Sequence, residues 1–152
     1  MEKKEATLIE IKSKLDSIRG TIISSASRIE FILGYRLRTY FFPKTNDKAT
    51  ILFWNVINTS FLSFDSKISI YESIPYFKRL KGYPRVKTSL RFIQRLRNIM
   101  AHWELDERNS DLENIVMFTL VSKYRKTTVN SSLVEEYEKH VKFLLKEFGY
   151  TR

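Results

Sequence analysis

The sequence predicts a mainly α fold: a compact α-helical bundle that forms one domain over residues 1–152, with a short β-hairpin near the C-terminus. Three observations predict it. Apolar residues recur at steps of three and four along much of the chain, as in helices with one buried face. Capping residues and prolines divide the chain into pieces of helical length. One run, residues 114–121, is instead β-branched and apolar, which favours a strand.

The first expected helix covers residues 5–41. Its apolar residues fall mostly at helical spacing: Leu8, Ile11, Leu15, Ile18, Ile22, Ile29, Ile32, Leu33 and Leu37. Gly20 and Gly34 weaken this pattern without ending it. Pro43 ends it, because proline lacks the backbone N–H that a helix interior needs.

A second helix is expected to follow Pro43. Asn46 or Asp47 can cap it, since both side chains accept a hydrogen bond from the first turn, and it runs to about Thr59. Trp54, within this helix, is expected to lie in the core.

Two further helices are expected before residue 104. Ser63 can cap the third, and Pro75 should kink or shorten it. Pro84 suits the first turn of the fourth, because its fixed φ is already helical. The fourth helix then runs to about Trp103.

The segment after Trp103 is the ambiguous one. Residues 104–113 are polar and predict a loop, and residues 114–121 predict a strand. The chain is then expected to turn through Lys123–Lys126 into a second strand near residues 127–130. The alternative for residues 111–130 is a helix, since Ser110 and Glu113 form a plausible capping box, but the hairpin is favoured.

The last expected helix begins at a cleaner capping box, Ser132 with Glu135. Its apolar residues again recur at helical spacing: Leu133, Tyr137, Val141, Leu144, Leu145 and Phe148. Gly149 is placed to end it, because glycine readily adopts the left-handed conformation at a helix C-terminus.

Composition excludes several classes of function. There is no cysteine, which excludes disulfide scaffolds, thiol nucleophiles and cysteine-ligated metal clusters. With four glycines no glycine-rich phosphate loop can be written, and with two histidines a dedicated transition-metal site is not expected. No cofactor is therefore expected. The start has no apolar signal segment, and the uncharged run 49–64 is too short and polar to span a bilayer, so we expect a cytoplasmic protein that does not enter the membrane.

The charge balance points to polyanionic partners. Lys and Arg number 27 against 17 acidic residues, for a net charge of +10. Residues 73–103 contain no acidic residue and carry eight cations: Lys78, Arg79, Lys81, Arg85, Lys87, Arg91, Arg95 and Arg97. Such a run is often only a solvated face. At about 100° per residue, however, Arg91, Arg95, Asn98 and His102 form one stripe opposite the apolar face, and Arg97 lies at the margin between them.

This stripe has the residue types that phosphodiester chemistry needs. Arginine holds a phosphate and neutralises the charge that develops on it. His102 lies off the apolar face, and a neutral imidazole is the form that a general base requires. The residues alone leave two alternatives open: phosphodiester cleavage, or phosphate binding without chemistry.

The segment Arg97-Asn98-Ile99-Met100-Ala101-His102 resembles the RxxxxH motif of the HEPN superfamily, in its RNxxAH form. Two other segments are similar to that superfamily: residues 28–33, which place Glu30 before an apolar pair on the first long helix, and residues 62–68, which resemble the turn and Lys-Ile helix start that often precede the motif. The resemblance covers roughly residues 20 to 145.

The resemblance implies a helical bundle that forms a homodimer, with a metal-independent endoribonuclease site shared between two motif copies. Carried over, Arg97 binds the scissile phosphate, His102 acts as general base or acid, Asn98 positions one of them, and Glu30 orients Arg97. The remaining cations, Arg85, Lys87, Arg91 and Arg95, are expected to bind RNA phosphates. A toxin or defence role with an antitoxin or nucleotidyltransferase partner would fit. The alternatives are a non-cleaving nucleic-acid- or nucleotide-binding relative, and an interaction protein whose basic face only solubilises it.

Overall fold

The longest element is helix α1 (Glu2–Phe41), about 60 Å long at 1.5 Å per residue. The structure is a computed structural model and describes residues 2–44, 46–59, 62–119 and 122–150. The buried positions of α1 follow one stripe, as its apolar spacing predicts: Ile11, Leu15, Ile22, Ala26, Ile29, Leu33 and Leu37. Later helices of the chain pack against α1.

The chain after α1 turns back through α2 (Asp47–Leu52), which passes directly into a π-helical turn, η1 (Phe53–Ile57). Asn46 is the N-cap, since its Oδ1 accepts from the backbone N–H of Ala49 at 2.8 Å. Gly34 lets this segment approach α1, because a Cβ there would lie 3.0 Å from Ile57 Cγ2. The core position expected for Trp54 is wrong: its side chain is 56% exposed, because the π turn presents Phe53 inward instead.

Helices α3 (Phe64–Ser73) and α4 (Pro75–Lys78) are separated by the proline that the sequence singles out. Ser63 caps α3 as expected, accepting from the N–H of Ser66. Pro75 ends the helix at Ile74 and begins the next, because it suits a first turn but not an interior.

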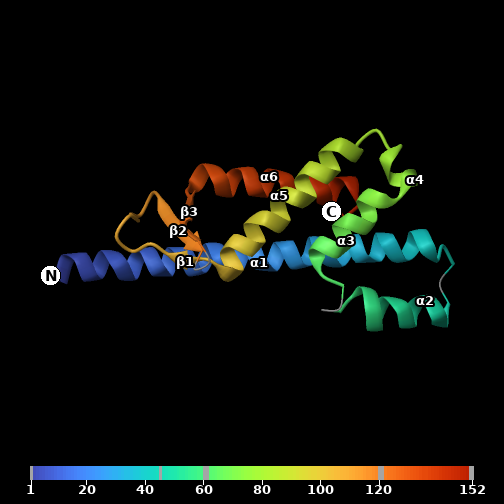
Figure 1. Cartoon of the computed structure of the whole chain (residues 1–152), viewed down its shortest axis with the longest axis horizontal. Coiled ribbons are helices and arrows are strands. Elements are labelled where there is room, and N and C mark those ends of the chain that lie inside the picture. Colours follow the sequence, from blue (N-terminus) through green and yellow to red (C-terminus); the bar gives the residue numbers. More distant parts are fainter. Residues whose placement is uncertain (1, 45, 60–61, 120–121, 151–152) are drawn as a thin grey trace.

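Helices α5 (Tyr83–His102) and α6 (Ser131–Glu147) complete the bundle. α5 crosses α1 diagonally and α6 lies along it, so that α5 contacts α1, α3 and α6 (Figure 1). The expected capping box at Ser132 is wrong by two residues: Asn130 is the N-cap, and its Oδ1 accepts from the N–H of Leu133 at 3.0 Å. Gly149 ends α6 with φ +78°, the left-handed conformation that favours glycine.

The hairpin, rather than the alternative helix, is present between α5 and α6. Strands β1 (Glu104–Leu105), β2 (Ile115–Thr119) and β3 (Ser122–Val129) form an antiparallel sheet in the order β1-β2-β3. The turn expected at Lys123–Lys126 is wrong, because Phe118 pairs with Lys126 and those residues belong to β3. β1 was expected to be loop; two residues paired with β2 carry too little pattern to be seen in the sequence.

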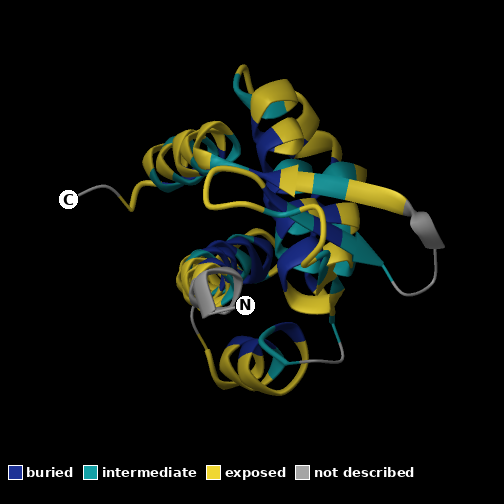
Figure 2. Cartoon of the chain, turned by 90° about the vertical axis from the view of Figure 1, so that its left-hand side faces the viewer, coloured by how far each residue is buried: buried dark blue, intermediate teal, exposed yellow. Residues whose placement is uncertain are grey.

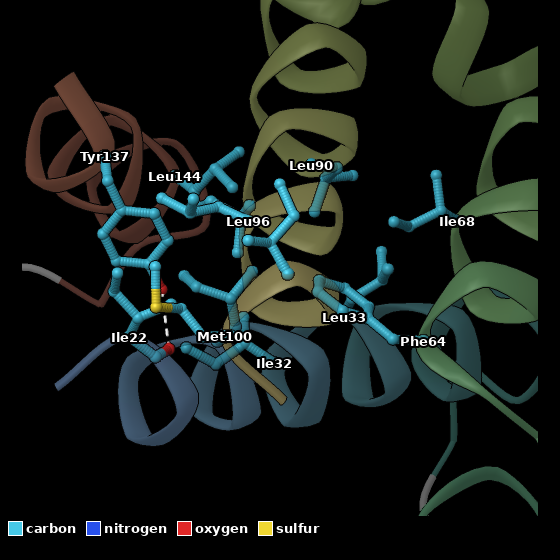
Figure 3. Close-up of a cluster of buried hydrophobic side chains, with 14 of the residues drawn as sticks. Ile22, Ile32, Leu33, Phe64, Ile68, Leu90, Leu96, Met100, Tyr137 and Leu144 are labelled. Atoms are coloured by element: carbon cyan, nitrogen blue, oxygen red, sulfur yellow. Dashed lines mark hydrogen bonds between the residues drawn. The ribbon is translucent and has the colours of Figure 1, made fainter. Parts of the chain in front are cut away.

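The core lies where α1, α5, α6 and the sheet meet. Figure 2 shows the buried residues facing the middle of the molecule and the exposed ones on the outer faces of the helices. In Figure 3, Ile22, Leu33, Ile68, Leu90 and Leu144, all with no exposed surface, interlock between four helices. Burying each such side chain contributes about 1.5–3 kcal/mol. The bundle therefore fixes α5 rigidly against α1.

Candidate functional site

The last two turns of α5 hold the motif residues at the edge of the core. Ile93, Leu96, Ile99 and Met100 are buried, so the apolar face of α5 is the one that the sequence predicts. Arg97 and Asn98 are half-buried at the margin, and His102 is exposed at the last position of the helix. The helix therefore keeps a rigid backbone beneath side chains that remain accessible.

Arg97 and Asn98 are joined directly. The Arg97 Nη1 donates to Asn98 Oδ1 at 3.2 Å, which holds the guanidinium against α5. Among the residues that the structure describes, no carboxylate forms an ion pair with Arg97, and His102 has no hydrogen-bond partner. Both groups are thus available to a ligand.

The end of α5 is tied to α1. Trp103, in an extended conformation, ends the helix with its N–H on the Ile99 carbonyl, and its own carbonyl accepts from Arg19 Nη2 at 2.7 Å. This contact joins residues that are 84 positions apart in the chain. It fixes the direction in which the chain leaves His102.

A basic cavity of about 570 Å³ opens beside the motif, between α5 and β3. It is lined by Gln94, Arg95, Asn98, Ile99, Trp103, Arg125, Lys126 and Thr127. Arg95 and Arg125 are exposed, whereas Lys126 is held at 2.7 Å by Asp106 Oδ2, and its hydrogen bond holds the pKa of that carboxyl below its usual range. Within the described ranges neither Arg95 nor Arg125 forms an ion pair with a carboxylate, so two unneutralised cations face this cavity.

The three β3 residues at this cavity were missed by the sequence reasoning. The segment Lys123–Lys126 was assigned to a turn, and a turn carries no fixed register against α5. The sequence does show three cations within these four residues, which could have indicated a basic surface. The expected fold, however, did not bring this segment close to the motif.

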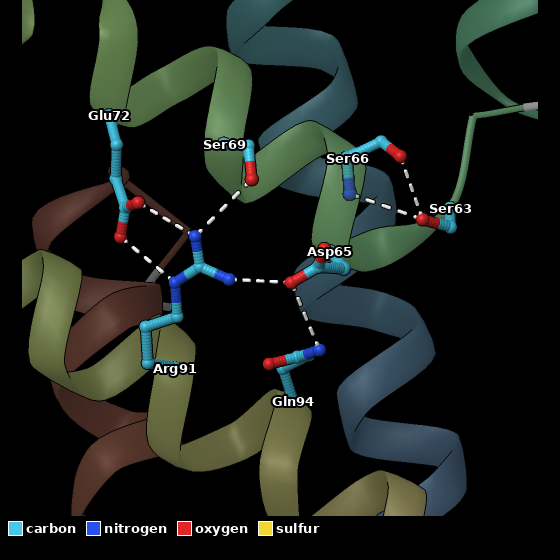
Figure 4. A network of polar contacts seen from close by, with 7 residues as sticks. All are labelled: Ser63, Asp65, Ser66, Ser69, Glu72, Arg91 and Gln94. Carbon is cyan, nitrogen blue, oxygen red and sulfur yellow. Dashed lines mark hydrogen bonds and ion pairs between the residues drawn. The ribbon is translucent and has the colours of Figure 1, made fainter.

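Arg91 is paired with acidic residues of a neighbouring helix. Its guanidinium donates to both oxygens of Glu72 at 2.9 and 2.7 Å, and to Asp65 Oδ1 at 2.6 Å (Figure 4). These hydrogen bonds lower the pKa of Glu72 and raise that of Arg91. The acidic partners come from α3, so the absence of acid along α5 did not reveal them. Arg91 links two helices, and its guanidinium would have to leave these carboxylates in order to bind a phosphate.

Glu30 also has another partner. Its Oε1 lies 2.6 Å from the Nζ of Lys67, whose side chain is 3% exposed. The expected contact with Arg97 is not among the hydrogen bonds and ion pairs of the described chain. Glu30 compensates a buried ammonium group, which is a structural role in itself.

The two remaining cations predicted to bind phosphate lie along the first half of α5. Lys87 is exposed there. The guanidinium of Arg85 lies 4.1 Å from the centre of the Phe143 ring, which directs it toward α6. Neither lines the cavity beside the motif.

His140 is part of the α5–α6 contact. Its Nδ1 shares a hydrogen bond of 2.8 Å with the fully buried Ser89 hydroxyl, and its ring packs on Phe92 at 4.5 Å between centres. Because Ser89 has no exposed surface, this pair resembles a nucleophile and base only in composition. It fixes the two helices together.

No protein-family model, curated protein or solved structure matches the chain. No helix in the described ranges is both long and apolar enough to cross a membrane. Within those same residues, no three His, Asp or Glu side chains gather in a way that would hold a metal ion.

Proposed function

We propose that the protein is a metal-independent endoribonuclease whose site is completed by a second copy of the chain. The observation that supports it most strongly is the state of two side chains on one rigid helix. Arg97 carries a charge that no described carboxylate neutralises. The side chain of His102, five residues later, is exposed and has no hydrogen-bond partner in the described part of the chain. The resemblance to the RxxxxH motif adds support.

In this proposal Arg97 holds the scissile phosphate and stabilises the charge that develops on its oxygens. His102 removes the proton of the 2′-hydroxyl, and the 2′-oxygen attacks the phosphorus. The bond to the 5′-oxygen then breaks, and a protonated histidine gives its proton to that oxygen. The products are a 2′,3′-cyclic phosphate and a free 5′-hydroxyl. Asn98 keeps the Arg97 guanidinium in place through its hydrogen bond.

The second copy is needed because the motif supplies a single histidine. Transesterification uses a base and an acid, and His140 is engaged with Ser89 in the bundle. A two-fold dimer repeats the same residues across its axis, so the partner's motif would provide the acid. In this proposal the protein acts in the cytoplasm as a toxin or defence effector, and an antitoxin or nucleotidyltransferase partner would restrain it.

A second candidate function is RNA binding without cleavage. It is favoured by one observation: Arg95, Asn98 and Arg125 line the basic cavity, whereas His102 does not. A phosphate bound at that cavity would be held without a proton acceptor beside it.

The deciding experiment measures cleavage of a short RNA and of the same RNA with a 2′-deoxy group at the cut site. We expect cleavage of the first in EDTA, none of the second, and a dimer by light scattering. Mixing the native protein with an excess of His102→Ala should lower the activity, because each mixed dimer keeps only one of the two histidines that the proposed chemistry uses. Full activity of a monomer would refute the shared site. Cleavage that is lost in EDTA would refute the metal-independent chemistry, and binding without cleavage would establish the second candidate.

A further inference from the structure

A second cavity lies at the opposite end of α5 from the motif. It measures about 750 Å³ and opens between the end of α1, α4 and the end of α6, which gather at the right of Figure 1. Since α5 has 20 residues, its two ends are about 30 Å apart. The cavity is therefore distinct from the site proposed above.

Half of the residues that line it are aromatic: Tyr35, Tyr40, Tyr76, Phe77, Phe148 and Tyr150. Tyr40 packs on Tyr76 at 5.8 Å and on Phe77 at 5.3 Å between ring centres. Tyr76 nevertheless keeps 57% of its surface exposed. A cluster of large rings that leaves faces open to solvent marks a binding surface more often than a folding core.

Two cations stand at the same wall. The guanidinium of Arg36 lies 4.8 Å from the centre of the Phe148 ring, and Lys81 is exposed in the turn before α5. Among the residues that the structure describes, no carboxylate forms an ion pair with either one. An anionic group in the cavity would therefore meet two unneutralised charges.

The single acidic residue that lines the cavity, Glu147, lies beside the N-terminus of α5. Its Oε1 would lie only 2.7 Å from a Cβ at Gly82, the N-cap of α5. A carboxylate at that place is stabilised by the positive end of the helix dipole. Its charge is thus directed at the helix terminus, and the cavity keeps a net positive character.

We propose that this cavity binds a nucleotide, with the base stacked on Tyr40 and Tyr76 and the phosphate held by Arg36 and Lys81. The chemistry of the wall selects this class. A purely apolar ligand would leave the two cations without a role, and a cationic ligand would be repelled by them. The volume suits a ligand of this size. Such a nucleotide is either free in solution or part of a single RNA strand, and the inference does not depend on cleavage at the motif.

The test is isothermal titration of the dialysed protein with four probes: a nucleoside monophosphate, the matching nucleoside, ribose 5-phosphate and a tetraribonucleotide. We expect the monophosphate or the tetranucleotide to bind, and the nucleoside and sugar phosphate each to bind at least ten-fold more weakly. Binding by the monophosphate identifies a free nucleotide as the ligand, and binding by the tetranucleotide alone identifies an RNA strand.

Matched variants locate the site. Tyr76→Ala should weaken binding about ten-fold or more, since stacking on a base is worth that much, and Lys81→Gln should weaken it several-fold. Trp54→Ala removes an equally exposed ring, and Lys139→Gln an exposed cation, outside the cavity, so both should leave binding unchanged. His102→Ala should leave binding of the monophosphate unchanged.

Several results would overturn the proposal: no binding of any nucleotide probe, equal binding of the sugar phosphate, or equal losses in the Trp54 and Tyr76 variants. A loss of binding in His102→Ala would place the nucleotide at the motif instead. Thermal unfolding of each variant shows that the fold is intact, and Tyr76, being largely exposed, is expected to tolerate substitution.

Discussion

Arg91 and Arg97 are six residues apart on the same helix, and the molecule uses them in opposite ways. Arg91 forms ion pairs with two carboxylates of α3, so its charge is neutralised in the contact between α3 and α5. Among the residues that the structure describes, Arg97 forms a side-chain hydrogen bond with the neutral Asn98 alone, so its charge remains available. The comparison teaches that a basic stretch read along the sequence contains both structural and functional cations, and that what distinguishes them is the neighbouring helix.

The largest expected effect lies on the Arg97 side of this comparison. His102→Ala should reduce RNA cleavage by about 10²–10⁴-fold, which is the usual contribution of a general acid or base. Its thermal stability should stay nearly unchanged, because the side chain is exposed. Arg97→Ala should behave alike, and the measurements are single-turnover cleavage and a melting curve. If either protein melts several degrees earlier while the other keeps full activity, the pair is structural and the comparison fails.

Glu30 provides the next largest effect and tests whether it belongs to the site. Glu30→Gln should destabilise the fold by about 3 kcal/mol, because the buried ammonium of Lys67 loses its counter-charge. Urea unfolding measures it. The control is the double variant Glu30→Gln with Lys67→Met, in which no charge is left buried, and stability should partly return. A fall in cleavage without a change in stability would instead return Glu30 to the role of orienting Arg97.

Arg91 and Arg95 form a matched pair that sharpens the comparison further. Arg91→Gln should cost about 1–2 kcal/mol of stability, a figure reduced for its partial exposure, and should leave RNA affinity unchanged. Arg95→Gln should do the reverse: unchanged stability, weaker binding, and a slope of log affinity against log salt that is smaller by about 0.7. Fluorescence anisotropy at several salt concentrations separates the two. Equal loss of RNA affinity in both would mean that Arg91 exchanges its carboxylates for phosphate.

The smallest effect is a pH dependence at Glu72. The hydrogen bond from Arg91 lowers the pKa of Glu72 from its ordinary 4.5. A carboxyl whose pKa is lower in the folded state stabilises the fold above its unfolded pKa, and this contribution is lost as the pH falls through the folded value. The stability difference between the native protein and Glu72→Gln should therefore be constant above about pH 5 and shrink toward pH 3. In an Arg91→Gln background the same substitution should show little pH dependence.

Much of the fold was predictable because it depends on local chemistry. The spacing of apolar residues specified α1 and the buried face of α5, since burial on a helix follows its own period. Ser63, Pro75, Pro84 and Gly149 marked helix ends, because each acts on the backbone within one turn. The hairpin was also favoured correctly over a helix, because the β-branched, apolar run at residues 114–121 is a local signal for a strand.

Errors arose where a residue's state depends on a partner far along the chain. The turn assigned to Lys123–Lys126 is strand, because pairing with β2 sets its extent. Trp54 is exposed because a π turn, which no local signal announces, rotates it outward.

The sequence by itself determined which residue types are available near the end of α5, their order, and the face from which they emerge, since helix geometry alone relates positions 97, 98 and 102. Only the tertiary structure decided which cations stay free. Electrostatic pairing acts over a few ångströms in space, and α3 and β3 reach α5 from distant parts of the chain. For that reason Arg91 pairs with carboxylates of α3 and Glu30 pairs with Lys67, and Arg125 lines the cavity beside the motif.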